Sequence, residues 1–102
     1  MKLARFTAEA KAELLAQTAY YEAIRKGLGA RFRTEVEAAA VRAAAFPEHG
    51  KPAPRNSRRR RLSDFKFSLV YVETEYGVLI HAVAPDQKMP EYWLARIPAR
   101  KK

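Results

Sequence analysis

The spacing of the apolar residues changes once along this chain, and the change divides it into a helical half and a sheet half. Up to Pro47, apolar residues recur at intervals of 3, 4 or 7, which is typical of helices that bury one face. From Phe65 to Tyr71, large apolar residues occupy every second position, and residues 78–84 then form a near-continuous apolar run. Alternation predicts a strand with one buried face, and the apolar run predicts a central strand covered on both faces. The sequence therefore predicts an α+β fold.

Two helices are predicted for the first half of the chain. The first covers residues 8–26, with Thr7 as its N-cap, because the threonine hydroxyl accepts a hydrogen bond from a free amide of the first turn. The second covers residues 30–46. The predicted apolar stripe of the first helix consists of Ala10, Leu14, Tyr21 and Ile24 and continues to Leu28 just beyond it, and the predicted inner face of the second consists of Phe32, Val36, Ala39, Ala40 and Ala43. The link between them is short and offers Gly27 as a left-handed cap, which predicts an antiparallel hairpin.

The remaining segments predict one sheet that packs on this hairpin. They are, in order, an N-terminal strand at 3–6, a loop at 48–57, a meander of three antiparallel strands at 58–62, 65–72 and 78–84, and a short C-terminal tail segment at 92–94. One face of the sheet is expected to cover the helices, and the other face or its edge to carry arginines. A chain of 102 residues is expected to form a single domain over residues 1–102.

Positive charge is concentrated in one part of the chain. The net charge is +9, from 20 basic and 11 acidic residues. Between Lys51 and Lys66 lie seven basic residues and one acidic residue, Asp64. A field of this sign attracts RNA, DNA or an acidic protein. The alternative is a solvated cationic face that only aids solubility.

Several kinds of chemistry find no support in the composition. The chain has no cysteine, so disulfides, thiolate metal sites and thiol nucleophiles are absent. His49 and His81 are the only histidines and lie far apart, so neither a metal site nor a cofactor is expected. No apolar run approaches the ~18 residues of a membrane span, and the amino terminus does not resemble a secretory signal. A cytoplasmic protein without a membrane partner is expected.

Local motifs occur in an order that is typical of one known family. They are Phe6-Thr7-Ala8-Glu9-Ala10, Ala19-Tyr20-Tyr21-Glu22, Gly27-Leu28-Gly29-Ala30-Arg31-Phe32, Phe46-Pro47-Glu48-His49-Gly50, the segment from Arg59 to Phe67 with Val70-Tyr71, Ala82-Val83-Ala84 and Pro90-Glu91-Tyr92-Trp93. In this order and at this spacing, the chain resembles the RelE/ParE superfamily of type II toxins over nearly its whole length. The helical hairpin is similar to that of the ParE-like branch.

This resemblance implies a toxin–antitoxin module of the kind that serves plasmid stabilization. The toxin would inhibit bacterial growth by binding an essential target, DNA gyrase by resemblance to ParE. A cognate antitoxin, expected to be acidic, would lie across the toxin and neutralise it. Two alternatives stay open: a ribosome-dependent mRNA endoribonuclease of the RelE type, and a non-toxic nucleic-acid-binding module. Gln87 and Lys88 stand where the RelE-type pattern has arginines, which favours the binding hypothesis.

The basic segment provides most of the predicted site. The residues expected to bind the target or nucleic acid are Arg58, Arg59, Arg60, Arg61, Lys66, Lys88, Tyr92 and Arg96. Arg59 and Arg61 share one face of a regular strand. No general base stands out, because His81 lies in an apolar strand as a core-edge residue and Asp64 is expected in a turn. Catalytic residues are therefore not assigned, and a ribonuclease activity would be metal-independent.

The aromatic residues have a simpler interpretation. Those expected to belong to the hydrophobic core are Tyr20, Tyr21, Phe32, Phe65, Phe67 and Tyr71. Trp93 is expected to pin the tail to the sheet.

Overall fold

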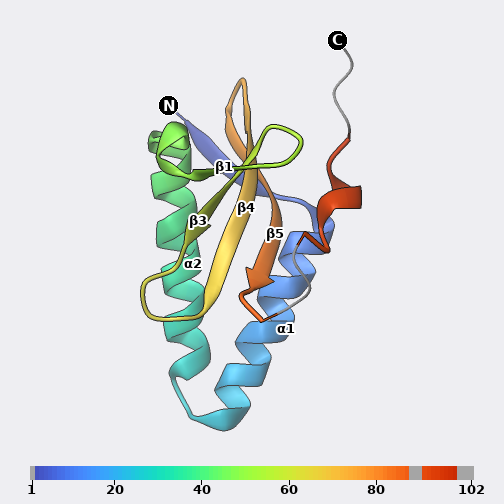
Figure 1. The fold of residues 1–102 in the computed structure, drawn as a ribbon. Helices are drawn as coiled ribbons and strands as arrows, with labels where there is room; N and C mark the ends of the chain where they lie inside the picture. Colours follow the sequence, from blue (N-terminus) through green and yellow to red (C-terminus); the bar gives the residue numbers. More distant parts are fainter. Residues whose placement is uncertain (1, 88–90, 99–102) are drawn as a thin grey trace.

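One five-stranded sheet with two helices against one face forms the described part of the chain, residues 2–87 and 91–98, in the computed structural model (Figure 1). The elements in order are β1 (Leu3–Phe6), α1 (Ala8–Ile24), α2 (Leu28–Ala45), the 3₁₀ turn η1 (Pro47–His49), β2 (Lys51–Ala53), β3 (Ser57–Arg61), β4 (Phe67–Thr74), β5 (Gly77–Pro85) and the 3₁₀ turn η2 (Leu94–Arg96). The predicted α+β order of strand, helical hairpin and antiparallel strands is confirmed. Neither helix combines the length and hydropathy that a membrane span requires.

The sheet has the strand order β1-β5-β4-β3-β2. β1 lies parallel to β5, and the other neighbours are antiparallel. β5, which corresponds to the predicted buried strand at 78–84, lies between β1 and β4, but β1 flanks only its first half. β1 pairs with residues 77–80 of β5 and then leaves the sheet to begin α1, so the later residues of β5 have no strand on that side. Their backbone groups need other partners.

The link between α1 and α2 is tight because one carboxylate caps both glycines. Glu22 accepts hydrogen bonds from the backbone N–H groups of Gly27 (2.9 Å) and Gly29 (3.0 Å). Gly27 has φ of 90°, the left-handed conformation that favours glycine. A side chain at Gly29 would collide with the carbonyl oxygen of Thr18. The link consists of three residues, Arg25 to Gly27, which is the predicted length. It lies two residues earlier than predicted, because α1 ends at Ile24 and α2 begins at Leu28.

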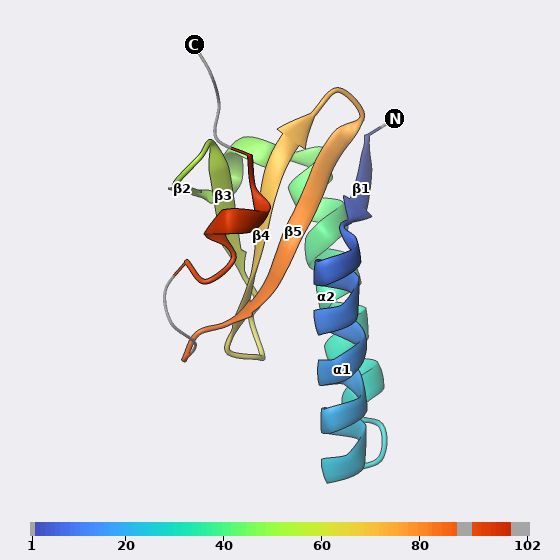
Figure 2. The ribbon, with the colours of Figure 1, turned by 90° about the vertical axis from the view of Figure 1, so that its right-hand side faces the viewer.

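Two predicted core residues, Tyr20 and Ile24, are exposed instead. Their exposed fractions are 60% and 59%. The end of the hairpin reaches beyond the sheet in both views, so this part of α1 has no strand to cover it (Figures 1 and 2). The remaining predicted aromatic core is buried or half-buried, and Tyr21, Phe32, Phe65 and Phe67 contact one another with ring centroids 5.1 to 6.4 Å apart.

β4 and β5 are buried on both faces, as the apolar run predicts. Toward the helices lies a core that includes Phe32, Val36, Leu69, Tyr71 and Ile80. On the opposite face lies a second cluster of Val70, Ala82, Ala84, Trp93 and Ile97. The last two residues belong to the segment around η2, which covers this face of the sheet in Figure 2. Trp93 is 1% exposed, so it pins the tail as expected.

The predicted loop at 48–57 contains an edge strand, which is a correction to the sequence-based assignment. β2 pairs with β3 through the three residues Pro54 to Asn56, of which Arg55 and Asn56 both have φ of 62°. These two residues are the central positions of a turn that the N–H of Ser57 closes by donating to the carbonyl oxygen of Pro54 at 3.3 Å, and positive φ at both positions is typical of hairpin turns. Pro52 and Pro54 suggested a loop because they lack an N–H group, but an edge strand tolerates that loss. The meander therefore has four antiparallel strands, not three.

Candidate functional site

Arg59 and Arg61 project from the face of β3 that points away from the helices. Arg59 is paired with Val70 on β4, and Val70 belongs to the cluster beneath the tail. Arg58 and Arg60 are paired with Tyr71 and Leu69, which face the helices. The predicted alternation of the four arginines is confirmed.

A groove of about 370 Å³ runs between this face of β3 and the tail. Its lining residues are Lys51, Pro52, Ala53, Pro54, Arg59, Arg61, Ser68, Asp86, Glu91 and Trp93. Lys51 lies directly across from Arg59 in the β2–β3 register, so three basic side chains line the strand side of the groove. The structure thereby brings together a basic surface from β2 and β3, of which the sequence had indicated only the arginines as site residues.

The three cations of the groove differ in their partners. Arg61 forms an ion pair of 2.9 Å with Asp86. No carboxylate of the described residues lies within ion-pairing distance of Lys51 or Arg59. Arg59 is half-buried as a residue, and its guanidinium has no such ion pair. Such a group favours an anionic ligand, because a charge-assisted hydrogen bond is stronger than one between neutral groups.

Arg58 has a structural role that the sequence did not indicate. Its Nη1 donates to the carbonyl oxygens of Gly50 (2.8 Å) and Glu48 (3.3 Å). On the same side, the hydroxyl of Tyr71 donates to the carbonyl oxygen of Pro47 at 2.7 Å. These bonds attach the η1 segment to the sheet. The guanidinium of Arg58 is thus hydrogen-bonded to backbone carbonyl oxygens, whereas Arg60 on the same face has no such bond in the described residues.

Of the other predicted site residues, Lys66 stands outside the groove. Lys66 lies in the connection before β4 and lines a separate surface hollow with Gln17 and Gln87. Lys88 lies outside the described residues. The groove and Lys66 are therefore distinct features of the surface.

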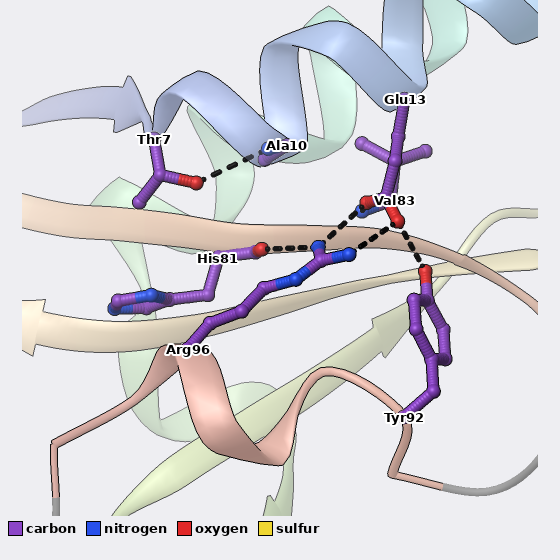
Figure 3. Close-up of polar contacts among 7 residues, drawn as sticks. All are labelled: Thr7, Ala10, Glu13, His81, Val83, Tyr92 and Arg96. Atoms are coloured by element: carbon purple, nitrogen blue, oxygen red, sulfur yellow. Dashed lines mark hydrogen bonds and ion pairs between the residues drawn. The ribbon is translucent and has the colours of Figure 1, made fainter.

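Tyr92 and Arg96 belong to a network centred on Glu13 of α1 (Figure 3). The Glu13 carboxylate accepts from the Tyr92 hydroxyl (2.6 Å), from both terminal nitrogens of Arg96 (3.1 and 3.0 Å) and from the backbone N–H of Val83 (3.0 Å). Arg96 also donates to the carbonyl oxygen of His81 at 3.0 Å. The structure places these two predicted binding residues against the sheet, where they hold the tail.

The network supplies hydrogen-bond partners for backbone groups of the part of β5 that β1 does not reach. The Val83 N–H and the His81 carbonyl lie beyond the last paired residue, Ile80, and they bond to Glu13 and Arg96 instead. Sequence reasoning did not single out Glu13. A glutamate in an amphipathic helix is usually a solvated surface residue. No local sequence pattern indicates that Glu13 pairs with Arg96, which lies 83 residues away.

The electrostatics of this network favour its ionised form. Burial alone would raise the pKa of Glu13, but the hydrogen bonds from Arg96, Tyr92 and Val83 outweigh it and hold the pKa below its ordinary value of 4.5. Burial and the neighbouring Glu13 carboxylate raise the pKa of the Tyr92 hydroxyl. The hydrogen bond to Glu13 likewise raises the pKa of Arg96. Glu13 and Arg96 therefore remain a charged pair around neutral pH.

His81 is the buried histidine that the sequence placed at the edge of the core. It is 7% exposed, its Nδ1 has no hydrogen-bond partner in the described structure, and burial lowers its pKa. It does not line the groove.

Asp64 lies in the bend between β3 and β4 and pairs with Arg31 at 3.7 Å, in keeping with a turn residue. The residues described include no cluster of three or more side chains suited to a metal ion.

A helical hairpin covers one face of the sheet, and a groove with three basic side chains, Lys51, Arg59 and Arg61, lies on the other. Residues 4–90 match the family described as the ParE toxin of type II toxin–antitoxin systems, ParDE. The chain therefore belongs to the ParE toxin family, which confirms the resemblance seen in the sequence.

The structure is similar to one described as a chromosomal ParDE toxin–antitoxin system from P. aeruginosa. The TM-score is 0.71 at 16% sequence identity, and the alignment covers 83% of this chain and 96% of the other. At this identity the likeness concerns the fold. No curated protein matches the chain significantly in sequence.

Proposed function

We propose that this chain, acting as one domain, is the growth-inhibiting toxin of a type II toxin–antitoxin module. It binds an essential cytoplasmic target, DNA gyrase, and a cognate antitoxin neutralises it by covering the basic face. Membership of the ParE family supports the target class, and the groove supports a mechanism based on binding. The observation that carries most weight is Arg59, a half-buried cation without a carboxylate partner among the described residues, in a groove open to a partner.

The arrangement of the tail favours binding over RNA cleavage. A ribonuclease of the RelE type would use an aromatic residue to hold a base and an arginine to hold the scissile phosphate. Tyr92 and Arg96, which the sequence indicated as residues that bind the target or nucleic acid, are bonded to Glu13. The buried His81 lies away from the groove.

The ribosome-dependent endoribonuclease is the second candidate, because Arg59 and Arg61 lie side by side in one groove with Lys51. Two guanidinium groups and an ammonium suit the stabilisation of a phosphorane. This candidate predicts a different kind of damage in the cell.

The two candidates separate in one experiment with induced expression in bacteria. A gyrase poison arrests growth, induces the DNA-damage response and leaves mRNA intact. A ribosomal nuclease arrests growth and produces codon-phased mRNA ends within minutes. Phased mRNA ends without DNA breaks would replace the first candidate by the second. Normal growth with folded protein would exclude both and favour a non-toxic nucleic-acid-binding module.

A further inference from the structure

Charge in the groove is divided between its two walls. Lys51 and Arg59 belong to the β2–β3 wall, whereas Asp86 and Glu91 lie on the side of the tail. Arg61 bridges to the tail side through its ion pair with Asp86. The groove is therefore a narrow basic strip with an acidic border, and the unpaired positive charge is concentrated at Lys51 and Arg59.

Lys51 and Arg59 are direct cross-strand neighbours on an antiparallel pair. Like charges in that position repel each other and destabilise the sheet slightly. Their side chains line the same groove, so one anionic group between them would remove the repulsion and accept hydrogen bonds from both. The pair has the character of a binding site for a single small anionic group.

The surroundings distinguish a carboxylate of a protein from a nucleic acid. Single-stranded nucleic acids bind through a basic track together with aromatic rings on which bases stack. The aromatic residue of this groove, Trp93, is 1% exposed, so its ring is not available for stacking. Asp86 and Glu91 would also repel a continuous chain of phosphates. A protein segment avoids that repulsion, because it carries a negative charge only where an acidic side chain stands.

The edge strand beside the groove favours recognition through side chains. Two of the four residues from Lys51 to Pro54 are prolines and have no N–H group to offer to an added strand. A partner segment that lies along this wall gains little from backbone pairing. Its affinity then depends on the charged groups that it presents to the groove.

We propose that Lys51 and Arg59 form a site for one carboxylate side chain carried by an acidic segment of a protein partner. Arg61 stays with Asp86 and bounds the site at one end. The identity of the partner as the antitoxin rests on the proposed function, whereas the site itself follows from the groove.

The test is a binding measurement on the full chain with two fluorescent probes, a decaglutamate peptide and a ten-nucleotide oligouridylate. Fluorescence anisotropy gives the affinity of each probe for the wild type and for Lys51→Gln, Arg59→Gln and Arg60→Gln. Arg60→Gln is the matched control, because it removes the same charge from the adjacent residue on the opposite face. Melting temperatures verify that each variant is folded.

We expect Arg59→Gln and Lys51→Gln each to weaken decaglutamate binding by at least about fivefold, and Arg60→Gln by less than about twofold, since one charge-assisted hydrogen bond is lost only in the first two. Equal losses in all three variants would overturn the site in favour of a general charge effect. A preference for oligouridylate that depends on Arg59 would overturn it in favour of nucleic acid, and no binding of the peptide would also overturn it. The measurement needs no antitoxin and no living cells, so absence of toxicity with intact peptide binding refutes the proposed function alone.

Discussion

Glu13 on α1 and Arg96 on the tail are joined by two hydrogen bonds, from Nη1 to Oε1 at 3.1 Å and from Nη2 to Oε2 at 3.0 Å. Both side chains are 22% exposed. The pair connects the first helix to the last described turn across the unpaired edge of β5. It gives the tail a fixed position on the sheet face that bears the groove.

Glu13→Gln is expected to lower the free energy of unfolding by about 1–3 kcal/mol, because it leaves a half-buried guanidinium without its charged partner. Thermal denaturation followed by circular dichroism measures the change. Glu37→Gln is the control. Glu37 pairs with Arg33 at 3.2 Å, but both side chains are more than half exposed, so this variant should change stability by less than about 0.5 kcal/mol. Equal effects of the two variants would contradict the structural role of Glu13.

The Glu13 network also predicts how stability depends on pH. Because the folded protein holds the pKa of Glu13 below its ordinary value of 4.5, the unfolded chain binds the proton more readily. The stabilisation is therefore complete above that value and is lost as the pH falls through the lower pKa of the folded state. Urea denaturation between about pH 6 and pH 3 should show a steeper loss for the wild type than for Glu13→Gln. Parallel pH profiles would refute the assignment.

Arg58 is expected to matter for folding, unlike its neighbours. Arg58→Gln removes the bonds to the Gly50 and Glu48 carbonyls and should lower the free energy of unfolding by about 1–2 kcal/mol. Arg60→Gln removes the same charge from the same face without breaking a bond of this kind, and should change stability by less than about 0.5 kcal/mol. Urea denaturation midpoints measure the stability of both variants. A destabilisation by Arg60→Gln as large as that by Arg58→Gln would show that the loss of charge, and not the loss of the hydrogen bonds, causes the destabilisation.

The sequence correctly predicted which side chains share a face of a strand or helix, because that depends only on local periodicity. The alternation over residues 58–61 correctly placed Arg59 and Arg61 on one face, because side chains in a strand alternate regardless of the rest of the fold. The alanine-rich face of α2 was predicted for the same reason, since Ala39, Ala40 and Ala43 recur at helical spacing and are buried.

What the sequence did not predict depends on contacts between distant segments. β2 was missed because Pro52 and Pro54 are local signals of a loop, whereas the tolerance of an edge strand for proline is a property of the sheet. The sequence did not indicate that Glu13 and Arg96 pair. Their contacts become necessary only because β1 ends at the level of Ile80, so the N–H of Val83 has no strand partner on that side of β5. Lys51 became a candidate only through its register with Arg59.

The central claim is that the arginines on the open face of β3 serve binding to a target and not the stability of the fold. The direct measurement is growth inhibition by induced Arg59→Gln/Arg61→Gln, compared with the wild type and with Arg60→Gln, together with the melting temperature of each purified protein. Arg61 is exposed, and among the described residues its ion pair is with Asp86 alone, so the double variant should melt within a few degrees of the wild type.

We predict that the double variant loses at least about tenfold in toxicity at equal expression, which corresponds to ~1.4 kcal/mol of binding free energy, and that Arg60→Gln remains toxic. Full toxicity of the double variant, or a loss of toxicity that accompanies unfolding, would contradict the account.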